Sequence, residues 1–190
     1  MGIQYQHQGL SHDGACLYVS NHRSMLDPLI QLGYIDAFIV SKAEVGRYPI
    51  LGRGAKETGI ILVERENHQS RKTALEAIER KLMSGYAVLI YREGTTHGGE
   101  FTGDFKRGAF ELAQKNNIPV VPVMIEYPGP DYYWVDGPLL GYFKRIFSSK
   151  GKHRVFGKTG MSLDPKQEHQ LLEKTKSQIN SMIRESRNLI

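Results

Sequence analysis

Residues 15–20 have the sequence ACLYVS, and residues 21–28 continue it as NHRSMLDP. The first segment is short and apolar, which is typical of a buried strand. The second segment is polar and holds His22 and Asp27 a fixed short distance apart. A histidine beside a carboxylate is what a general base and its orienting acid require. The stretch therefore predicts a strand that ends in a chemically active loop.

A second apolar run, residues 86–90, also leads into a polar segment, which reads YREGTTHGG at residues 91–99. Ligands of open α/β sheets bind at the ends of the strands. We therefore expect the two polar segments to form one site.

Short runs rich in β-branched or aromatic residues predict five strands, at residues 15–20, 37–41, 59–64, 86–91 and 119–126. Helical spacing of apolar residues predicts helices at residues 69–83 and 108–115, and a third from Pro165 to Asn188 with Asp164 as its cap. Strands that alternate with helices indicate an α/β fold with a mixed, largely parallel sheet flanked by helices.

The composition predicts a single globular domain over residues 1–190. Hydrophobic residues make up 40% of the chain and charged residues 24%, which argues against disorder. The one cysteine, Cys16, has no partner for an internal disulfide. The start of the chain lacks the pattern of a secretion signal, and no window reaches the length of a membrane span. We expect a cytoplasmic protein.

The formal net charge is +5, and the sequence pI is near 9.2. This favours acidic partners, which include nucleic acid, an anionic membrane or an acidic carrier protein. Residues 128–160 form the least regular part of the chain. Their aromatic and basic run, residues 142–154, is a candidate for contact with an anionic bilayer, and the alternative is a solvated basic loop.

The spacing of His22 and Asp27 has a plain alternative explanation. Five residues on an ideal helix do not stack side chains on one face, so the pair needs a loop or a helix start. Pro28 disfavours a helical conformation at Asp27, which predicts Asp27 as N-cap and Pro28 as the first helical residue. From the spacing alone, Asp27 is either a cap or a partner of His22.

Several blocks of this sequence, in this order, resemble the glycerolipid acyltransferase family, of the bacterial 1-acylglycerol-3-phosphate or lysophospholipid acyltransferase type. The blocks are residues 21–28, 42–44 with 49–52, 59–65, 93–95, 105–109 and 118–123. The resemblance covers roughly residues 18–126 and implies a fold like that of glycerol-3-phosphate acyltransferase. It also implies catalytic roles for His22 and Asp27.

The resemblance implies that a fatty acyl group moves from an acyl thioester to the hydroxyl of a lysolipid such as 1-acylglycerol 3-phosphate. The donor would be acyl-ACP or acyl-CoA, with no further cofactor and no metal. By the same resemblance, the substrate-binding residues are Asn21, Arg23, Ser24, Lys42, Arg65, Glu93, Gly94, Thr95 and Thr96. We expect His97 to be a loop residue, because no paired spacing of metal ligands accompanies it.

Two departures from the family pattern concern the acceptor. Arg92 stands where the family usually has proline, and Thr96 stands where many phosphate-acceptor members have arginine. In this respect the segment is more similar to members that acylate other lysolipids, including lyso-ornithine lipids. An acceptor without phosphate is thus the alternative to 1-acylglycerol 3-phosphate.

The chemistry of these residue types suits acyl transfer. An imidazole titrates close to neutrality and can take the proton of the acceptor hydroxyl, and a carboxylate on its other nitrogen fixes the tautomer. We expect backbone N–H groups at the helix start near Asp27 to receive the oxyanion.

Other classes of function fit the sequence less well. A thioesterase or other hydrolase would use the same pair with water, but the chain has no G-x-S-x-G motif and Cys16 lies inside the strand. A nucleic-acid-binding module would explain the pI and leaves His22, Asp27 and Glu93 without a role. Many family members begin with apolar anchoring helices, and here about 20 residues precede His22. We expect docking to the inner face of the membrane, or an anchor outside this chain.

Overall fold

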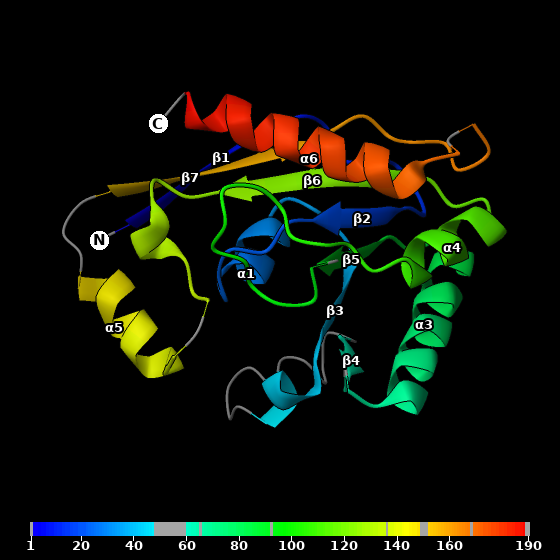
Figure 1. Ribbon diagram of the computed structural model, residues 1–190, viewed down its shortest axis with the longest axis horizontal. Helices are drawn as coiled ribbons and strands as arrows, with labels where there is room; N and C mark the ends of the chain where they lie inside the picture. Colours follow the sequence, from blue (N-terminus) through cyan, green and yellow to red (C-terminus); the bar gives the residue numbers. More distant parts are fainter. Residues whose placement is uncertain are drawn as a thin grey trace.

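One seven-stranded sheet organises the chain (Figure 1). The computed structural model describes residues 2–47, 60–64, 66–91, 93–135, 137–148, 152–167 and 169–188. The strands are β1 (Gly2–Gln8), β2 (Leu17–Ser20), β3 (Phe38–Lys42), β4 (Ile61–Val63), β5 (Val88–Tyr91), β6 (Val120–Glu126) and β7 (Lys152–Thr159). Their order in the sheet is β1-β7-β6-β2-β5-β3-β4.

The sheet is mixed and largely parallel, as the alternation of strands and helices predicts. Within the described residues every neighbouring pair of strands is parallel except β6 and β7, which are antiparallel. Strand β2 lies between β5 and β6, and it runs parallel to both. The loops that follow β2, β5 and β6 therefore leave the sheet at the same edge, and this adjacency creates the site.

Helices cover both faces of the sheet. They are α1 (Asp27–Gln31), α3 (His68–Met83), α4 (Gly108–Lys115), α5 (Leu139–Ser148) and α6 (Leu171–Arg187), with 3-10 turns η1 (Ala43–Arg47) and η2 (Pro130–Tyr132). The Asn67 side chain caps α3 by accepting a hydrogen bond from the Ser70 N–H at 3.1 Å. Helix α4 ends before Asn117, which has a left-handed φ of 54°.

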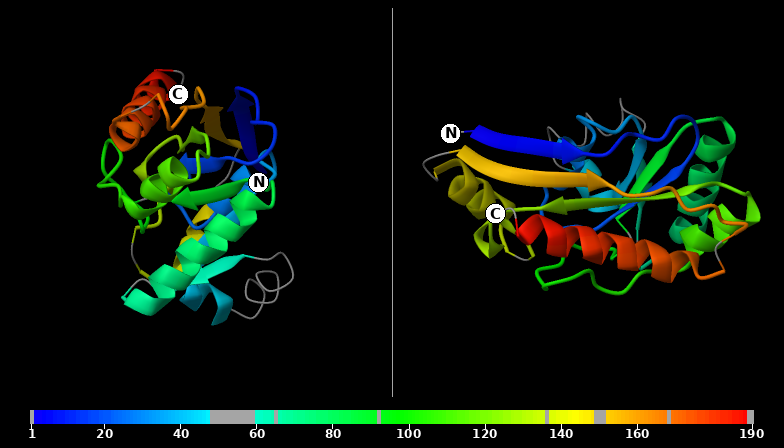
Figure 2. Two further views of the ribbon diagram at one scale, coloured as in Figure 1. Left: turned by 90° about the vertical axis from the view of Figure 1, so that its right-hand side faces the viewer. Right: turned by 90° about the horizontal axis from the view of Figure 1, so that it is seen from above.

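Alternation along the central strands divides the core between the two faces. Leu17 and Val19 of β2 pack in one cluster with buried residues of α3, α4 and α6. Tyr18 of β2 and Leu89 of β5 pack on the opposite face with Ile35, which follows α1. Because successive side chains of a strand point to opposite faces, a near-continuous apolar run serves both clusters. Figure 2 shows α6 running along one side of the sheet.

The part of the chain after residue 126 is more regular than the sequence indicates. Helix α5 and strand β7 lie within the segment read as irregular, and strand β1 was not predicted. Helix α6 begins at Leu171 instead of Pro165. Asp164 caps a preceding turn, where its carboxyl accepts the Lys166 N–H at 2.9 Å. None of the described helices is both long and apolar enough to cross a membrane.

A matched pair of glycine substitutions tests the packing of β1 on β7. A Cβ at Gly157 of β7 would collide with the Tyr5 hydroxyl, whereas nothing lies within 4 Å of a Cβ at Gly141 on α5. Gly157→Ala should destabilise the fold by about 1–3 kcal/mol, because Tyr5 must move. Gly141→Ala should stabilise α5 by roughly 0.5–1 kcal/mol. Thermal unfolding measures both, and an unchanged Tm in Gly157→Ala would contradict this packing.

Candidate active site

The His22 and Asp27 side chains meet, as the loop between β2 and α1 brings them together. The His22 Nδ1 lies 2.9 Å from the Asp27 Oδ2. A carboxylate only accepts hydrogen bonds, so Nδ1 carries the proton and Nε2 keeps its lone pair. The His22 side chain is 12% exposed and Asp27 is fully buried. The ring also stacks on Tyr91, with the centroids 4.2 Å apart. The imidazole is thus oriented and remains open to solvent.

Both oxygens of the buried Asp27 carboxylate accept hydrogen bonds. Its Oδ2 accepts the backbone N–H groups of Arg23 at 2.6 Å and Ser24 at 2.8 Å, in addition to His22 Nδ1. Its Oδ1 accepts the Tyr127 hydroxyl at 2.6 Å. An ionised carboxyl is an acceptor-only group, and these donors match that inventory.

One expectation about the helix start is wrong. Helix α1 begins at Asp27, so Leu26 occupies the cap position in place of Asp27, and no side-chain hydrogen bond caps it. The N–H groups of Leu26 and Asp27 bond to Ser24 Oγ and Ser24 O. The Arg23 and Ser24 N–H groups donate to Asp27 Oδ2, so all four of these N–H groups bond to acceptors within the protein. The expectation that N–H groups at this helix start receive an oxyanion stays a prediction.

Asn21 and Ser24 hold the loop in place from both ends. The Asn21 amide donates to Ile125 O at 2.8 Å and accepts from Ile125 N at 2.9 Å, which continues the pairing of β2 with β6. The Ser24 hydroxyl bonds to the Tyr142 hydroxyl of α5. Both residues are buried. Their predicted role in binding substrate stays a prediction, and their observed contacts are with the protein.

Arg23 joins the two loops that the sequence singles out. Its guanidinium is fully buried and donates to the backbone carbonyls of His97 at 2.8 Å, Gly99 at 2.6 Å and Glu100 at 3.2 Å. The fourth contact, at 3.3 Å, is with the carboxylate of Glu126 at the end of β6. The described contacts of Arg23 are therefore with the protein, and its predicted role in binding substrate stays a prediction.

Glu126 receives a second cation from the last helix. The Arg187 guanidinium of α6 lies 3.2 Å from the Glu126 Oε2, and the Tyr133 hydroxyl donates to Oε1 at 2.5 Å. Glu126 is fully buried. A buried charge needs such pairing to be tolerated. The ion pairs of Glu126 with Arg23 and Arg187 therefore link α6 to the loop that holds His22.

The loop after β5 carries Glu93, Gly94, Thr95 and Thr96 beside the His22 loop. The His97 N–H donates to His22 O at 2.7 Å, which fixes the two loops to each other. Gly94 has a φ of 76°, a conformation that favours glycine at this turn. Thr95 is exposed. The Thr96 Oγ1 is buried, and none of the described groups hydrogen-bonds to it.

The electrostatics of this loop are unusual at Glu93. Burial raises the pKa of Glu93 to about 7. The Arg23 guanidinium and the backbone N–H groups of Gly103 and His22 oppose this rise, and the Asp27 charge adds to it. Near neutral pH, the Glu93 carboxyl is therefore protonated in part of the molecules and ionised in the rest.

Other residues named from the sequence lie apart from the pair or outside the description. Lys42 is exposed at the carboxyl end of β3, and none of the described contacts joins it to His22. Arg65 lies outside the described residues, as do residues 49–52 of the second block. Burial and the charges of Arg23 and Lys176 lower the pKa of the His97 ring. The described residues contain no group of three or more His, Cys, Asp or Glu side chains that could hold a metal.

Sequence reasoning missed the tyrosines around the pair. Tyr91 stacks on His22, Tyr127 bonds to Asp27, and Tyr142 bonds to Ser24. The buried position of Tyr142 also corrects its expected contact with a bilayer. The sequence offered one signal for two of them. Tyr91 is the last residue of β5 and Tyr127 directly follows β6, and these are the two strands beside β2. Nothing local marks Tyr142.

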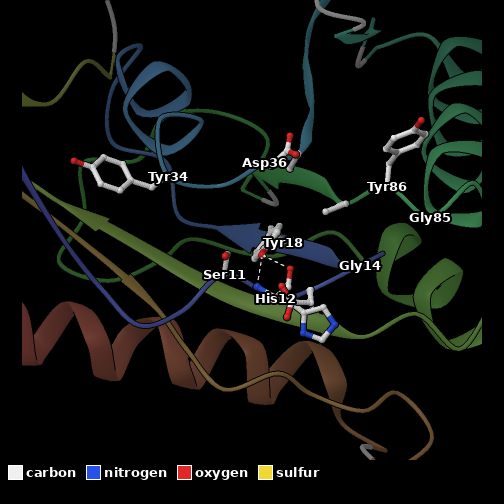
Figure 3. A pocket seen from close by; sticks show the side chains of 11 residues that line it. Ser11, His12, Gly14, Tyr18, Tyr34, Asp36, Gly85 and Tyr86 are labelled. Carbon is white, nitrogen blue, oxygen red and sulfur yellow. Dashed lines mark hydrogen bonds between the residues drawn. The ribbon is translucent and has the colours of Figure 1, made fainter.

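A separate cavity of about 330 Å³ lies at the opposite edge of the sheet (Figure 3). Residues that precede β2, β3 and β5 line it, among them His12, Asp36 and Tyr86. The parallel strands place these residues at their amino ends, whereas His22 follows the carboxyl end of β2. The cavity is therefore distinct from the His22 site.

The protein is thus an α/β protein with a paired imidazole and carboxylate at the carboxyl ends of its parallel strands. A family described as Acyltransferase matches residues 3–126. The chain belongs to this family.

Named relatives share part of the sequence. A 1-acyl-sn-glycerol-3-phosphate acyltransferase of Helicobacter pylori is 33% identical over 65% of this chain and 54% of its own length. A chloroplastic enzyme of the same name from Brassica napus is 35% identical over 60% of this chain and 34% of its own length. A lyso-ornithine lipid O-acyltransferase of Rhodobacter capsulatus is 27% identical over 78% of this chain and 57% of its own length. The chain thus spans about a third to just over half of these curated relatives.

One solved structure shares the fold over nearly the whole chain. The crystal structure of the 1-acyl-sn-glycerophosphate acyltransferase PlsC from Thermotoga maritima aligns with a TM-score of 0.70 and 21% identity. The alignment covers 97% of this chain and 73% of that protein. It confirms the α/β fold class predicted from the sequence.

The raised pKa of Glu93 predicts a pH-dependent stability. A carboxyl whose pKa rises from 4.5 to about 7 on folding holds its proton more tightly in the folded state, so stability falls as pH rises through this window. Glu93→Gln removes the titration. The stability of the variant relative to wild type should grow between about pH 5 and pH 8, by on the order of 2 kcal/mol. Thermal unfolding at both pH values measures it, and a constant difference would contradict the burial of this charge.

Proposed function

We propose that the chain transfers a fatty acyl group from an acyl thioester to the hydroxyl of a lysolipid. His22 Nε2 takes the hydroxyl proton while the acceptor oxygen attacks the thioester carbonyl. The tetrahedral intermediate collapses by breaking the C–S bond, and the imidazolium returns its proton to the leaving thiolate. The products are an ester and a free thiol, and no covalent enzyme intermediate is required.

One observation carries this proposal: the 2.9 Å contact between His22 Nδ1 and the fully buried Asp27 carboxylate. It fixes the tautomer that leaves Nε2 basic and stabilises the imidazolium that forms during the reaction. Membership of the Acyltransferase family supports acyl transfer as the reaction that this pair performs.

The acceptor in this proposal is a lysolipid such as 1-acylglycerol 3-phosphate. The names of the Helicobacter and Brassica relatives support this class. A phosphate-free lysolipid of the lyso-ornithine type is the second candidate. It is favoured by the buried Thr96, whose hydroxyl has no described partner where many phosphate-acceptor members have arginine, and by the Rhodobacter relative.

The proposed donor is acyl-ACP or acyl-CoA, with no other cofactor. Both are anionic thioesters, which suits the formal charge of +5. Both donors occur in the cytoplasm, so the proposal places the reaction at the inner face of the membrane.

Substitution of the pair tests the mechanism directly. His22→Ala and Asp27→Asn should each lower turnover by roughly 10²- to 10⁴-fold, because they remove the base and its orienting group. Release of free thiol from one labelled acyl-thioester donor, followed with the lysolipid present and absent, measures turnover. His68→Ala is the matched control, since His68 is exposed at the start of α3. Near-normal rates in a folded His22→Ala or Asp27→Asn variant would rule out this mechanism.

The same assay separates the candidate acceptors and the alternative reaction. Thiol release that depends on lysophosphatidate supports the first candidate, and dependence on a lyso-aminolipid supports the second. Thiol release at the same rate without any acceptor would identify a thioesterase and contradict acyl transfer.

We also propose that the exposed face of α5 contacts an anionic membrane surface. Helix α5 packs its Tyr142 and Ile146 side chains against Leu26, while Leu140 and Lys144 are exposed one turn apart. The helix lies at the end of the molecule where β2 and β6 end (Figure 1). An exposed apolar side chain beside a cation suits an interface of acyl chains and anionic headgroups.

A charge reversal on α5 tests this contact. Lys144→Glu should weaken binding to vesicles that contain phosphatidylglycerol by roughly fivefold or more, because it replaces attraction with repulsion. Cosedimentation measures the bound fraction. Lys72→Glu, an equal change of charge at an exposed position on α3, is the control. Equal binding by both variants would place the membrane contact elsewhere.

A further inference from the structure

Tyr127 is the first residue after β6, and its hydroxyl reaches the Asp27 carboxylate. The hydroxyl donates to Oδ1 at 2.6 Å. The Tyr127 side chain is 3% exposed, so the bond is shielded from water. The family match ends at residue 126, so Tyr127 lies just outside it.

The two oxygens of Asp27 are supported unequally. Oδ2 accepts from His22 Nδ1 and from the N–H groups of Arg23 and Ser24. Among the described hydrogen bonds, Oδ1 has Tyr127 as its one donor. Without that hydroxyl, a buried anionic oxygen would lack a partner, and the carboxyl would gain freedom to turn about its Cβ–Cγ bond. The Tyr127 hydroxyl thus satisfies the Asp27 oxygen that does not face His22.

Tyr127 is itself held firmly. Its N–H donates to the Glu126 Oε1 at 3.2 Å, and its ring packs edge-on against Tyr133. Glu126 is in turn bound by Arg23 and Arg187. Burial and the adjacent Asp27 charge raise the pKa of Tyr127 well above its ordinary value, so its hydroxyl keeps the proton that it donates.

We propose that Tyr127 is a positioning residue for acyl transfer, which acts through Asp27 by holding Oδ1 so that Oδ2 orients the His22 imidazole. This inference rests on the proposed function. It adds a residue from the end of β6 to a pair that the sequence places entirely in the loop after β2. The hydroxyl touches neither substrate nor the reacting nitrogen.

Tyr127→Phe removes the hydroxyl and keeps the ring. We expect kcat to fall roughly tenfold or more, with KM for donor and acceptor unchanged. The acid limb of the pH profile of kcat/KM should move to higher pH, because a carboxylate with one donor fewer holds the protonated imidazole more strongly. The downfield proton resonance of His22 Nδ1–H should shift in the NMR spectrum of the full chain.

Tyr18→Phe is the matched control. Tyr18 is also buried, and its hydroxyl also makes hydrogen bonds that the change removes: it accepts from His12 N and donates to His12 O at the opposite end of the strands. It should leave kcat, the pH profile and the His22 resonance as in wild type. If both variants lower kcat equally with unchanged pH profiles, the effect is general destabilisation and the inference is overturned.

The outcomes also separate this inference from the proposed function. Loss of turnover in His22→Ala together with wild-type kcat, pH profile and NMR resonance in Tyr127→Phe would overturn the role of Tyr127 alone. Retained turnover in His22→Ala would overturn the function itself. If Tyr127→Phe also destabilises the fold, the His22 Nδ1–H resonance is recorded well below the Tm of the variant. That resonance still decides whether Tyr127 positions Asp27, because a purely structural role would leave it unshifted.

Discussion

The need to satisfy one buried carboxylate determines the shape of the loop between β2 and α1. Asp27 is fully buried, and an unpaired charge there would cost several kcal/mol. Its donors are the ring of His22, the backbone of the next two residues and the hydroxyl of Tyr127. To bring these groups to one carboxyl, the chain must turn sharply after β2 and begin a helix at Asp27. The orientation of the imidazole is thus a consequence of the same hydrogen bonds that make the charge tolerable.

A second layer of charge keeps the neighbouring loops against this turn. Arg23 binds three backbone carbonyls of the loop after β5, and Glu126 neutralises it from the end of β6. Arg187 extends the chain of ion pairs to α6. The family match stops at residue 126, while the structural likeness covers 97% of the chain. The segment beyond residue 126 therefore contributes the supports of a site whose reactive groups lie within the matched part.

The central strands and the reactive pair could be predicted from the sequence because their signals are local. Residues 15–20 and 86–91 are apolar runs, and parallel strands bring the polar segments after them to one edge. The partners of Asp27 and Arg23 could not be predicted, since Tyr127 and Glu126 lie about 100 residues away. The acceptors around Arg23 could not be predicted for the same reason, since only the folded structure brings them to its guanidinium. Strand β1, at the edge of the sheet, could not be predicted because its composition is polar and it contains no apolar run.

The pairing of β1 with β7 imposes an order on assembly. Gly2 to Gln8 find their hydrogen-bonding partners about 150 residues later, at Lys152 to Lys158. A ribosome releases the N-terminal segment long before those partners exist, and loop closure over such a distance is slow compared with local contacts. Strands β2 to β6 pair with one another and can associate before β1 joins the sheet. Strand β1 therefore precedes its partner by about 150 residues in the chain, and it is among the last strands to join the sheet.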